Sequence, residues 1–187
     1  MRNSFIWNRR AAWRACPAAL VLIVAFVPLG CKRKPAAVVT EQPGRLAPFV
    51  RMGDQRAEMQ LWKGFYGIEG GAWRWTARQF SVILLPPAGA DRNGARLEFR
   101  LSVPATVIDK LRQISLSASI DGQSLKSDTY VQPGDYTYAA DVPAELLTGE
   151  SVKVDFQLDR VMPPIPPDVR ELGVVAQSVG LQTKPAK

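Results

Sequence analysis

Strict alternation of apolar and polar residues constrains this chain more than any other feature of its sequence. Every second residue is apolar through most of three segments, 95–103 (ARLEFRLSV), 114–120 (ISLSASI) and 151–158 (SVKVDFQL). Because successive side chains of a β-strand point to opposite faces of a sheet, each segment can bury one face and leave the other in water. Such half-buried strands are typical of antiparallel sheets and argue against a parallel sheet that is covered on both faces.

Turn signals and weaker strands complete this pattern. Asp121-Gly122 predicts a two-residue hairpin, and Gly and Pro residues predict further turns at 132–135 and 148–150. Weaker strands are expected at 79–85, 123–130, 136–142 and 172–181, and short helical connections at 103–113 and 142–149. The predicted fold is therefore all-β, an antiparallel two-sheet β-sandwich of seven to nine strands that is jelly-roll-like.

The first thirty residues combine a basic start with an apolar run. Arg2, Arg9, Arg10 and Arg14 precede the run 18–30 (AALVLIVAFVPLG), and no acidic residue occurs among them. This order is typical of a signal peptide. The apolar run falls short of the ~20 residues that a membrane-spanning helix needs. We therefore expect a signal helix within a signal peptide over 1–30.

The apolar run ends in VPLGC, which resembles the lipobox of bacterial lipoproteins. The resemblance implies that Cys31 becomes the lipidated first residue of the mature protein and anchors it to a membrane. Cys16 lies within the signal peptide, so the mature chain keeps one cysteine and can form no internal disulfide. The alternative is ordinary cleavage near Gly30, which would release a soluble protein. The expected location is the bacterial cell envelope, with the anchored protein facing the periplasm or the exterior.

The net charge of +7 belongs to the N-terminal segment. Of the 24 Lys and Arg residues, four lie in 1–30 and three are the KRK of 32–34, which leaves 17 cations against 17 acidic residues. A nucleic-acid-binding face would need basic residues spread over the folded domain, so we expect no nucleic-acid partner. From 31 to 58 the sequence shows no sustained apolar period. It predicts a disordered tether over 31–58, a sandwich over 59–182 and a C-terminal tail over 183–187.

The absence of histidine excludes several kinds of active site. The chain has no His, and no cysteine follows Cys31. Triads with a His base and ordinary zinc sites are therefore excluded, and no nucleotide-binding or EF-hand motif is present. We expect no catalytic residues, no metal and no cofactor. Paired carboxylates remain the one catalytic option, for a small glycoside hydrolase, and the candidates are Glu69, Asp135, Asp155, Asp159 and Asp168.

Two separated segments stand out, GFYGIEGGAWRWT (64–76) and DVRELGVVAQSVGL (168–181). Together they resemble the ends of a β-sandwich domain that is found beside bacterial glycosyltransferases and that is similar to galactose-binding-like jelly rolls. The matching positions are Gly64, Phe65, Tyr66, Glu69, Arg74 and Trp75 in the first segment and Asp168, Arg170, Leu172 and Gly173 in the second. The resemblance implies a sandwich fold of a kind that occurs together with carbohydrate-active proteins. Fold alone does not determine function.

The aromatic residues of 64–76 form either a ligand platform or a packed corner. Because Trp73 and Trp75 are two residues apart, a strand there would bury both and turn Arg74 to the other face. We expect Trp75 to lie between the sheets with Trp73 partly buried beside it. Glu69 is expected to pair with Arg74, and Tyr66 to face solvent. The candidate ligand-binding residues are Phe65, Tyr66, Glu69, Trp73 and Arg74.

These observations lead to an expected function. The chain is expected to be a noncatalytic envelope lipoprotein whose sandwich binds a glycan or an envelope protein. Its partners would then be the membrane, through a lipid anchor on Cys31, together with that glycan or protein. The alternatives are a structural or assembly lipoprotein with no glycan site and, further off, the carboxylate-dependent hydrolase.

Overall fold

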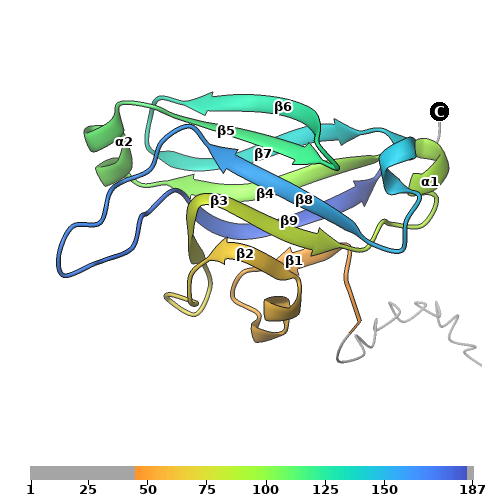
Figure 1. The fold of residues 1–187 in the computed structure, drawn as a ribbon, viewed down its shortest axis with the longest axis horizontal. Coiled ribbons are helices and arrows are strands. Elements are labelled where there is room, and N and C mark those ends of the chain that lie inside the picture. Colours follow the sequence, from red (N-terminus) through yellow and green to blue (C-terminus); the bar gives the residue numbers. More distant parts are fainter. Residues whose placement is uncertain (1–44, 185–187) are drawn as a thin grey trace, which may run out of the picture. The chain divides into compact units, whose positions relative to one another are not determined.

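A computed structural model describes residues 45–184, and Figure 1 shows their arrangement. The chain divides into two units, Met1–Val39 and Thr40–Lys187, and all described residues belong to the second. Within them the strands are β1 (Phe49–Arg51), β2 (Leu61–Phe65), β3 (Arg74–Leu84), β4 (Ala95–Val103), β5 (Ile114–Ile120), β6 (Gln123–Tyr130), β7 (Gly134–Val142), β8 (Val152–Leu158) and β9 (Val175–Thr183). The helical connections are η1 (Gln55–Met59), α1 (Ala90–Asn93), α2 (Ala105–Leu111) and η2 (Ala144–Leu147).

All strand pairs are antiparallel and form two layers that share β3. The order of strands is β6-β5-β8-β3-β9-β4-β7, with β1 beside β9 and β2 beside β3. One layer holds β6, β5, β8, β3 and β2, and the other holds β7, β4, β9 and β1. This architecture confirms the predicted all-β antiparallel sandwich. The ends of the strand order also meet, because the Tyr138 hydroxyl of β7 donates a hydrogen bond to the Lys126 carbonyl of β6.

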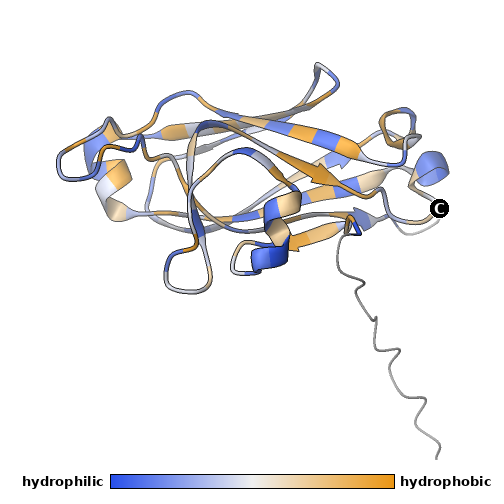
Figure 2. Cartoon of the chain, turned by 60° about the horizontal axis from the view of Figure 1, so that its bottom comes forward, coloured by the Kyte–Doolittle hydropathy of each residue, from blue (hydrophilic) through white to orange (hydrophobic). Residues whose placement is uncertain are grey.

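The core lies between the layers and is built from the alternating apolar residues. At its centre, the Phe80 and Phe156 rings stack with centroids 5.0 Å apart, and the Phe99 ring of the opposite layer lies 5.1 Å from Phe156. Figure 2 shows the alternation as successive apolar and polar bands along several strands. The predicted inward faces of 95–103, 114–120 and 151–158 are confirmed, since their apolar members are buried.

Strand β3 passes from one layer to the other. Its first residues, Arg74 and Trp75, pair with β9, whereas Gln79–Leu84 pair with β8. Between these two pairings the alternation of burial breaks, because Arg78 and Gln79 are consecutive and both exposed. The even-numbered residues are nevertheless the buried ones on both sides of Arg78, so the two halves of β3 keep the same inward face.

The predicted hairpin at Asp121-Gly122 is confirmed. It joins the antiparallel strands β5 and β6, and the two residues have φ values of 49° and 80°. Positive φ at both central residues is the mark of a type I′ turn, whose twist matches that of the flanking strands.

The structure corrects the predicted start of the sandwich. Residues 49–58, assigned above to the tether, contain β1 and all of η1 except Met59, and Val50, Met52 and Ala57 are buried. A strand of three residues is too short to show a period of two, which explains the error. The predicted tail is also shorter, because β9 continues to Thr183. The signal peptide, Cys31 and residues 31–44 of the tether lie outside the described residues.

Candidate functional site

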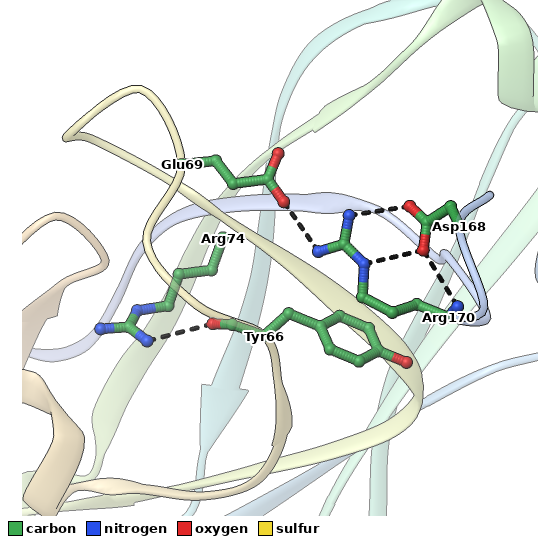
Figure 3. Close-up of polar contacts among 5 residues, drawn as sticks. All are labelled: Tyr66, Glu69, Arg74, Asp168 and Arg170. Carbon is green, nitrogen blue, oxygen red and sulfur yellow. Dashed lines mark hydrogen bonds and ion pairs between the residues drawn. The ribbon is translucent and has the colours of Figure 1, made fainter.

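The two segments that carry the resemblance meet at one corner of the sandwich, around Arg170 (Figure 3). Arg170 donates to both carboxylate oxygens of Asp168, at 3.0 and 2.8 Å, and to Glu69 Oε1 at 2.7 Å. Its guanidinium also lies 5.1 Å from the centre of the Tyr66 ring, within the range of a cation–π contact. We call Tyr66, Glu69, Asp168 and Arg170 the Arg170 cluster.

Close packing of backbone holds these segments together. The Gly173 N–H donates to the Thr76 carbonyl at 2.7 Å, and the Val174 N–H donates to the Thr76 hydroxyl at 3.1 Å. A Cβ atom at Gly173 would lie 2.4 Å from Leu158 Cδ1, and one at Gly64, where φ is 75°, would lie 2.0 Å from the Gln79 carbonyl oxygen. Both glycines therefore permit contacts that no other residue allows.

Arg74 occupies a separate, buried position and does not pair with Glu69. Its side chain is 2% exposed and donates to the Met52 carbonyl at 2.9 Å, the Tyr66 carbonyl at 3.0 Å and Glu58 Oε1 at 2.8 Å. The predicted Glu69 to Arg74 pair is thus wrong, and each residue has a different partner. Three acceptors offset the cost of removing the guanidinium from water, which allows it to take an inward position on β3.

The face predicted to be buried is wrong, because Arg74 takes the inward position, but Trp73 is partly buried beside Trp75 as predicted. Arg74 and Thr76 are buried, whereas Trp73 and Trp75 are only partly buried and pack edge to face with ring centroids 6.3 Å apart. The prediction that Trp75 lies buried between the sheets is therefore wrong. Phe65 packs against Phe80 at 5.3 Å. Tyr66 is partly buried beside Arg170 and is not a free ring facing solvent.

The polar groups of the Arg170 cluster are largely occupied by one another. Hydrogen bonds from Arg170 lower the pKa of Asp168 to about 2, and the bonds to Asp168 and then Glu69 raise the pKa of Arg170. Partial burial, aided by the Glu171 carboxylate, raises the pKa of Tyr66. A cluster whose charges are mutually satisfied orders a corner well. It leaves few groups that face outward to bind a ligand.

A second candidate site lies on the outer face of the layer that holds β6, β5, β8, β3 and β2. This open hollow has a volume of about 370 Å³. We call it the sheet hollow. Strand register brings its polar residues into rows, because Ser124 faces Ser119, Ser119 faces Asp155, Asp155 faces Ser81 and Ser81 faces Lys63. The residues that line it are Lys63, Gln79, Ser81, Ser117, Ala118, Ser119, Ser124, Lys153, Asp155, Phe156 and Gln157.

Some polar groups of the sheet hollow are engaged and others remain available. Asp155 accepts from the Ser81 hydroxyl at 2.5 Å and pairs with the Lys153 ammonium at 3.1 Å. Gln79 and Gln157 are direct partners across β3 and β8 and are both exposed. Among the hydrogen bonds of the described residues, none involves the side-chain amide of either glutamine. Two amides with free donors and acceptors therefore lie side by side on this face.

The sheet hollow was not among the predicted sites. The outward serines of 114–120 and the outward Asp155 and Gln157 were visible in the alternation of the sequence. What the sequence lacked was the order of the strands, which brings Gln79 and Lys63 beside them.

Within residues 45–184, no three His, Cys, Asp or Glu side chains are placed to hold a metal ion. None of the helices in this range has the length and apolar character that a membrane crossing requires.

No protein-family model matches the chain, and no curated protein matches it significantly. Several solved structures match the chain at a low level of similarity. An acetyl xylan esterase, Est2A, from the rumen bacterium Butyrivibrio proteoclasticus matches with a TM-score of 0.43 and 9% identity, over 76% of this chain and 35% of that one. The CBM51-2 and INT domains of Clostridium perfringens ZmpB, with GlcNAc bound to CBM51-2, match with a TM-score of 0.35 and 10% identity, over 73% and 28%.

A structure described as CBM4 matches with a TM-score of 0.32 and 12% identity, over 72% of this chain and 85% of that one. The solved structures similar to this chain thus include carbohydrate-binding modules. The chain spans about a third of the length of the esterase and of the ZmpB fragment. At this level of similarity, the matches indicate neither a ligand nor an activity for this chain.

Proposed function

We propose that this chain is a noncatalytic lipoprotein of the bacterial cell envelope whose sandwich binds a glycan in the sheet hollow. The observation that carries the glycan part is the pair of unengaged amides, Gln79 and Gln157, that face each other across β3 and β8. A side-chain amide both donates and accepts hydrogen bonds, so it can bind the neighbouring hydroxyl groups of a sugar. The serine hydroxyls of β5 and β6 add further groups of the same kind.

The dimensions of the sheet hollow favour an oligosaccharide. Its lining residues come from five adjacent strands, and neighbouring strands lie ~4.8 Å apart. The hollow therefore extends ~19 Å from β6 to β2, which is longer than one sugar ring. Lys63 and Lys153 outweigh the single acid Asp155 by one positive charge. A glycan that carries carboxylate groups is therefore the best match in charge.

The carboxylates of the described residues support a binding role over hydrolysis. Asp155 is the only acid that lines the sheet hollow, whereas glycoside hydrolysis by carboxylates needs two of them on either side of the bond. Asp155 is further engaged by Ser81 and Lys153. We therefore propose that the protein has no catalytic activity toward glycosides.

The second candidate is a structural or assembly lipoprotein with no glycan site. The observation that favours it is the Arg170 cluster, in which residues of the two segments that carry the resemblance bind one another. These contacts indicate that the two segments stabilise the corner of the sandwich. They do not bear on the sheet hollow, which lies on other strands.

A glycan array tests the proposal. The full chain is screened on neutral and carboxylate-bearing oligosaccharides beside the double variant Gln79→Ala with Gln157→Ala. Gln123→Ala is the matched control, because Gln123 is an exposed glutamine of β6 that does not line the hollow. We expect the double variant to lose the array signal and the control to keep it. Equal signals from all three proteins would contradict the proposal, as would the absence of any signal from the unmodified chain.

A further inference from the structure

Exposed apolar side chains gather on the segment from β1 to β2. Among the described residues, six large apolar side chains are exposed, and three of them fall in this segment, Phe49 at 42%, Met59 at 63% and Trp62 at 66%. A lone exposed apolar residue needs no explanation, but several in one place mark a contact surface. Trp62 is notable because burial of an indole ring is worth a large free energy.

A polar bridge joins the two chain segments that carry these three residues. The Gln60 side chain accepts from the Ala47 N–H at 3.0 Å and donates to the Ala47 carbonyl at 2.9 Å and the Ile83 carbonyl at 2.7 Å. Phe49 follows Ala47 by two residues, whereas Met59 and Trp62 flank Gln60. We call Phe49, Met59 and Trp62 the edge patch. It lies where β1 and β2 form one border of the sandwich, since each pairs with a single neighbour.

Basic residues belong to the same part of the chain. Arg45 and Arg51 are exposed there, and the Arg51 guanidinium lies 5.9 Å from the centre of the Phe49 ring. The acids of the same segment are engaged, because Asp54 pairs with Arg56 and Glu58 pairs with the buried Arg74. Apolar and aromatic side chains with a basic rim are the composition that binds an anionic lipid surface.

The position of the edge patch in the chain points to the same occupant. Cys31, the proposed site of lipidation, precedes the exposed Arg45 by 14 residues, and Phe49 follows four residues later. Fourteen residues reach at most about 50 Å even when fully extended. A lipid on Cys31 would thus hold the edge patch at high local concentration near the membrane surface.

We propose that the edge patch is a second membrane contact, in which Trp62, Met59 and Phe49 enter the headgroup region of an anionic bilayer. The contact would orient the sandwich relative to the membrane, with its β1 and β2 border against the lipid. This inference rests on the proposed membrane anchoring and is independent of the glycan site.

The test measures the depth of Trp62 in vesicles. The full chain is reconstituted into vesicles of phosphatidylcholine and phosphatidylglycerol whose acyl chains carry bromine, which quenches tryptophan on contact. Flotation first establishes that the chain is bound. Because the chain has 5 tryptophans, the emission of Trp62 is obtained as the difference between the unmodified chain and Trp62→Phe. We expect bromine to reduce this difference emission roughly twofold or more, since an interfacial ring reaches the start of the acyl chains.

Further variants test whether the basic residues are needed for the contact of Trp62 with lipid. Arg45→Gln with Arg51→Gln should lose most of the quenching of Trp62 on anionic vesicles, whereas Lys110→Gln, at an exposed lysine of α2, should not. Trp73→Phe should leave the quenched fraction from Trp62 unchanged.

Three results overturn the inference. If the chain floats with the vesicles and Trp62 is not quenched, the edge patch does not touch lipid, and the anchoring proposal stands. If Trp62 is already shielded from aqueous acrylamide before vesicles are added, residues 1–44 or a second copy of the chain covers the patch. If the chain does not float at all, this inference and the proposed anchoring fail together, while the glycan array still judges the sheet hollow.

Discussion

Arg74 and Glu58 are partners, but they differ greatly in what their removal leaves behind. The Arg74 side chain is 2% exposed and Glu58 is 63% exposed. Without Arg74, the carbonyls of Met52 and Tyr66 lose their donor and a cavity forms in the corner. Without Glu58, the guanidinium keeps two acceptors. Removing Arg74 should therefore lower the free energy of unfolding far more than removing Glu58, although both substitutions break the same ion pair.

We predict that Arg74→Ala lowers the free energy of unfolding by about 3–5 kcal/mol, the usual cost of removing one partner from a buried polar network. Glu58→Ala should cost less than about 1 kcal/mol, because its carboxylate is largely solvated. Urea unfolding of the full chain, followed by circular dichroism, measures both. Equal losses would show that Arg74 is not the anchor of this corner.

The Arg170 cluster predicts a dependence of stability on pH. Its hydrogen bonds lower the pKa of Asp168 from 3.8 to about 2 in the folded protein. A group with a depressed pKa stabilises the fold above its unfolded pKa, and this stabilisation is lost as the pH falls toward 2. Asp168→Asn should therefore be less stable than the unmodified chain at pH 7. This difference in stability should become steadily smaller as the pH falls from 5 to 2. Thermal melts of both proteins over that pH range measure the difference, and a difference that stays constant would contradict the prediction.

At the scale of the element, the β5–β6 hairpin has the clearest link between sequence and geometry. Gly122 has φ of 80° and open space around the position of a Cβ atom, so only its backbone conformation resists substitution. Gly122→Ala should cost about 1 kcal/mol. Gly67→Ala is the control, because Gly67 also has open space but no left-handed backbone. Urea unfolding compares the two, and equal effects would mean that the turn does not require glycine.

Elements with a repeated period could be predicted, and the others could not. β4, β5 and β8 each show several apolar residues at a spacing of two, so both their existence and their buried faces follow from the sequence. β1 has too few residues to show a period. In β3 the even-numbered residues are buried on both sides of the exposed Arg78, and Arg74 is stabilised inward by carbonyls that are distant in sequence. The sequence pattern around Trp75 does not reveal those carbonyls.

At the scale of the whole molecule, the candidate site follows from how the strands are ordered. The outward residues of each strand could be identified from the sequence, but Gln79 and Gln157 are 78 positions apart and become neighbours only when β3 pairs with β8. Likewise, Glu69 and Arg170 meet across 101 residues of sequence. The resemblance identified both halves of that corner in advance. Only the structure shows that they bind each other.

The measurement that tests the account most directly is a map of where a glycan binds. Backbone amide NMR shifts of the full chain are followed as the oligosaccharide selected on the array is added. Shifts should concentrate on the sheet hollow, at Gln79, Ser81, Ser119, Asp155 and Gln157, and leave Tyr66, Glu69 and Arg170 unchanged. Shifts confined to Tyr66, Glu69 and Arg170 would place the site at the corner instead, and a spectrum that does not change at any glycan concentration would contradict glycan binding altogether.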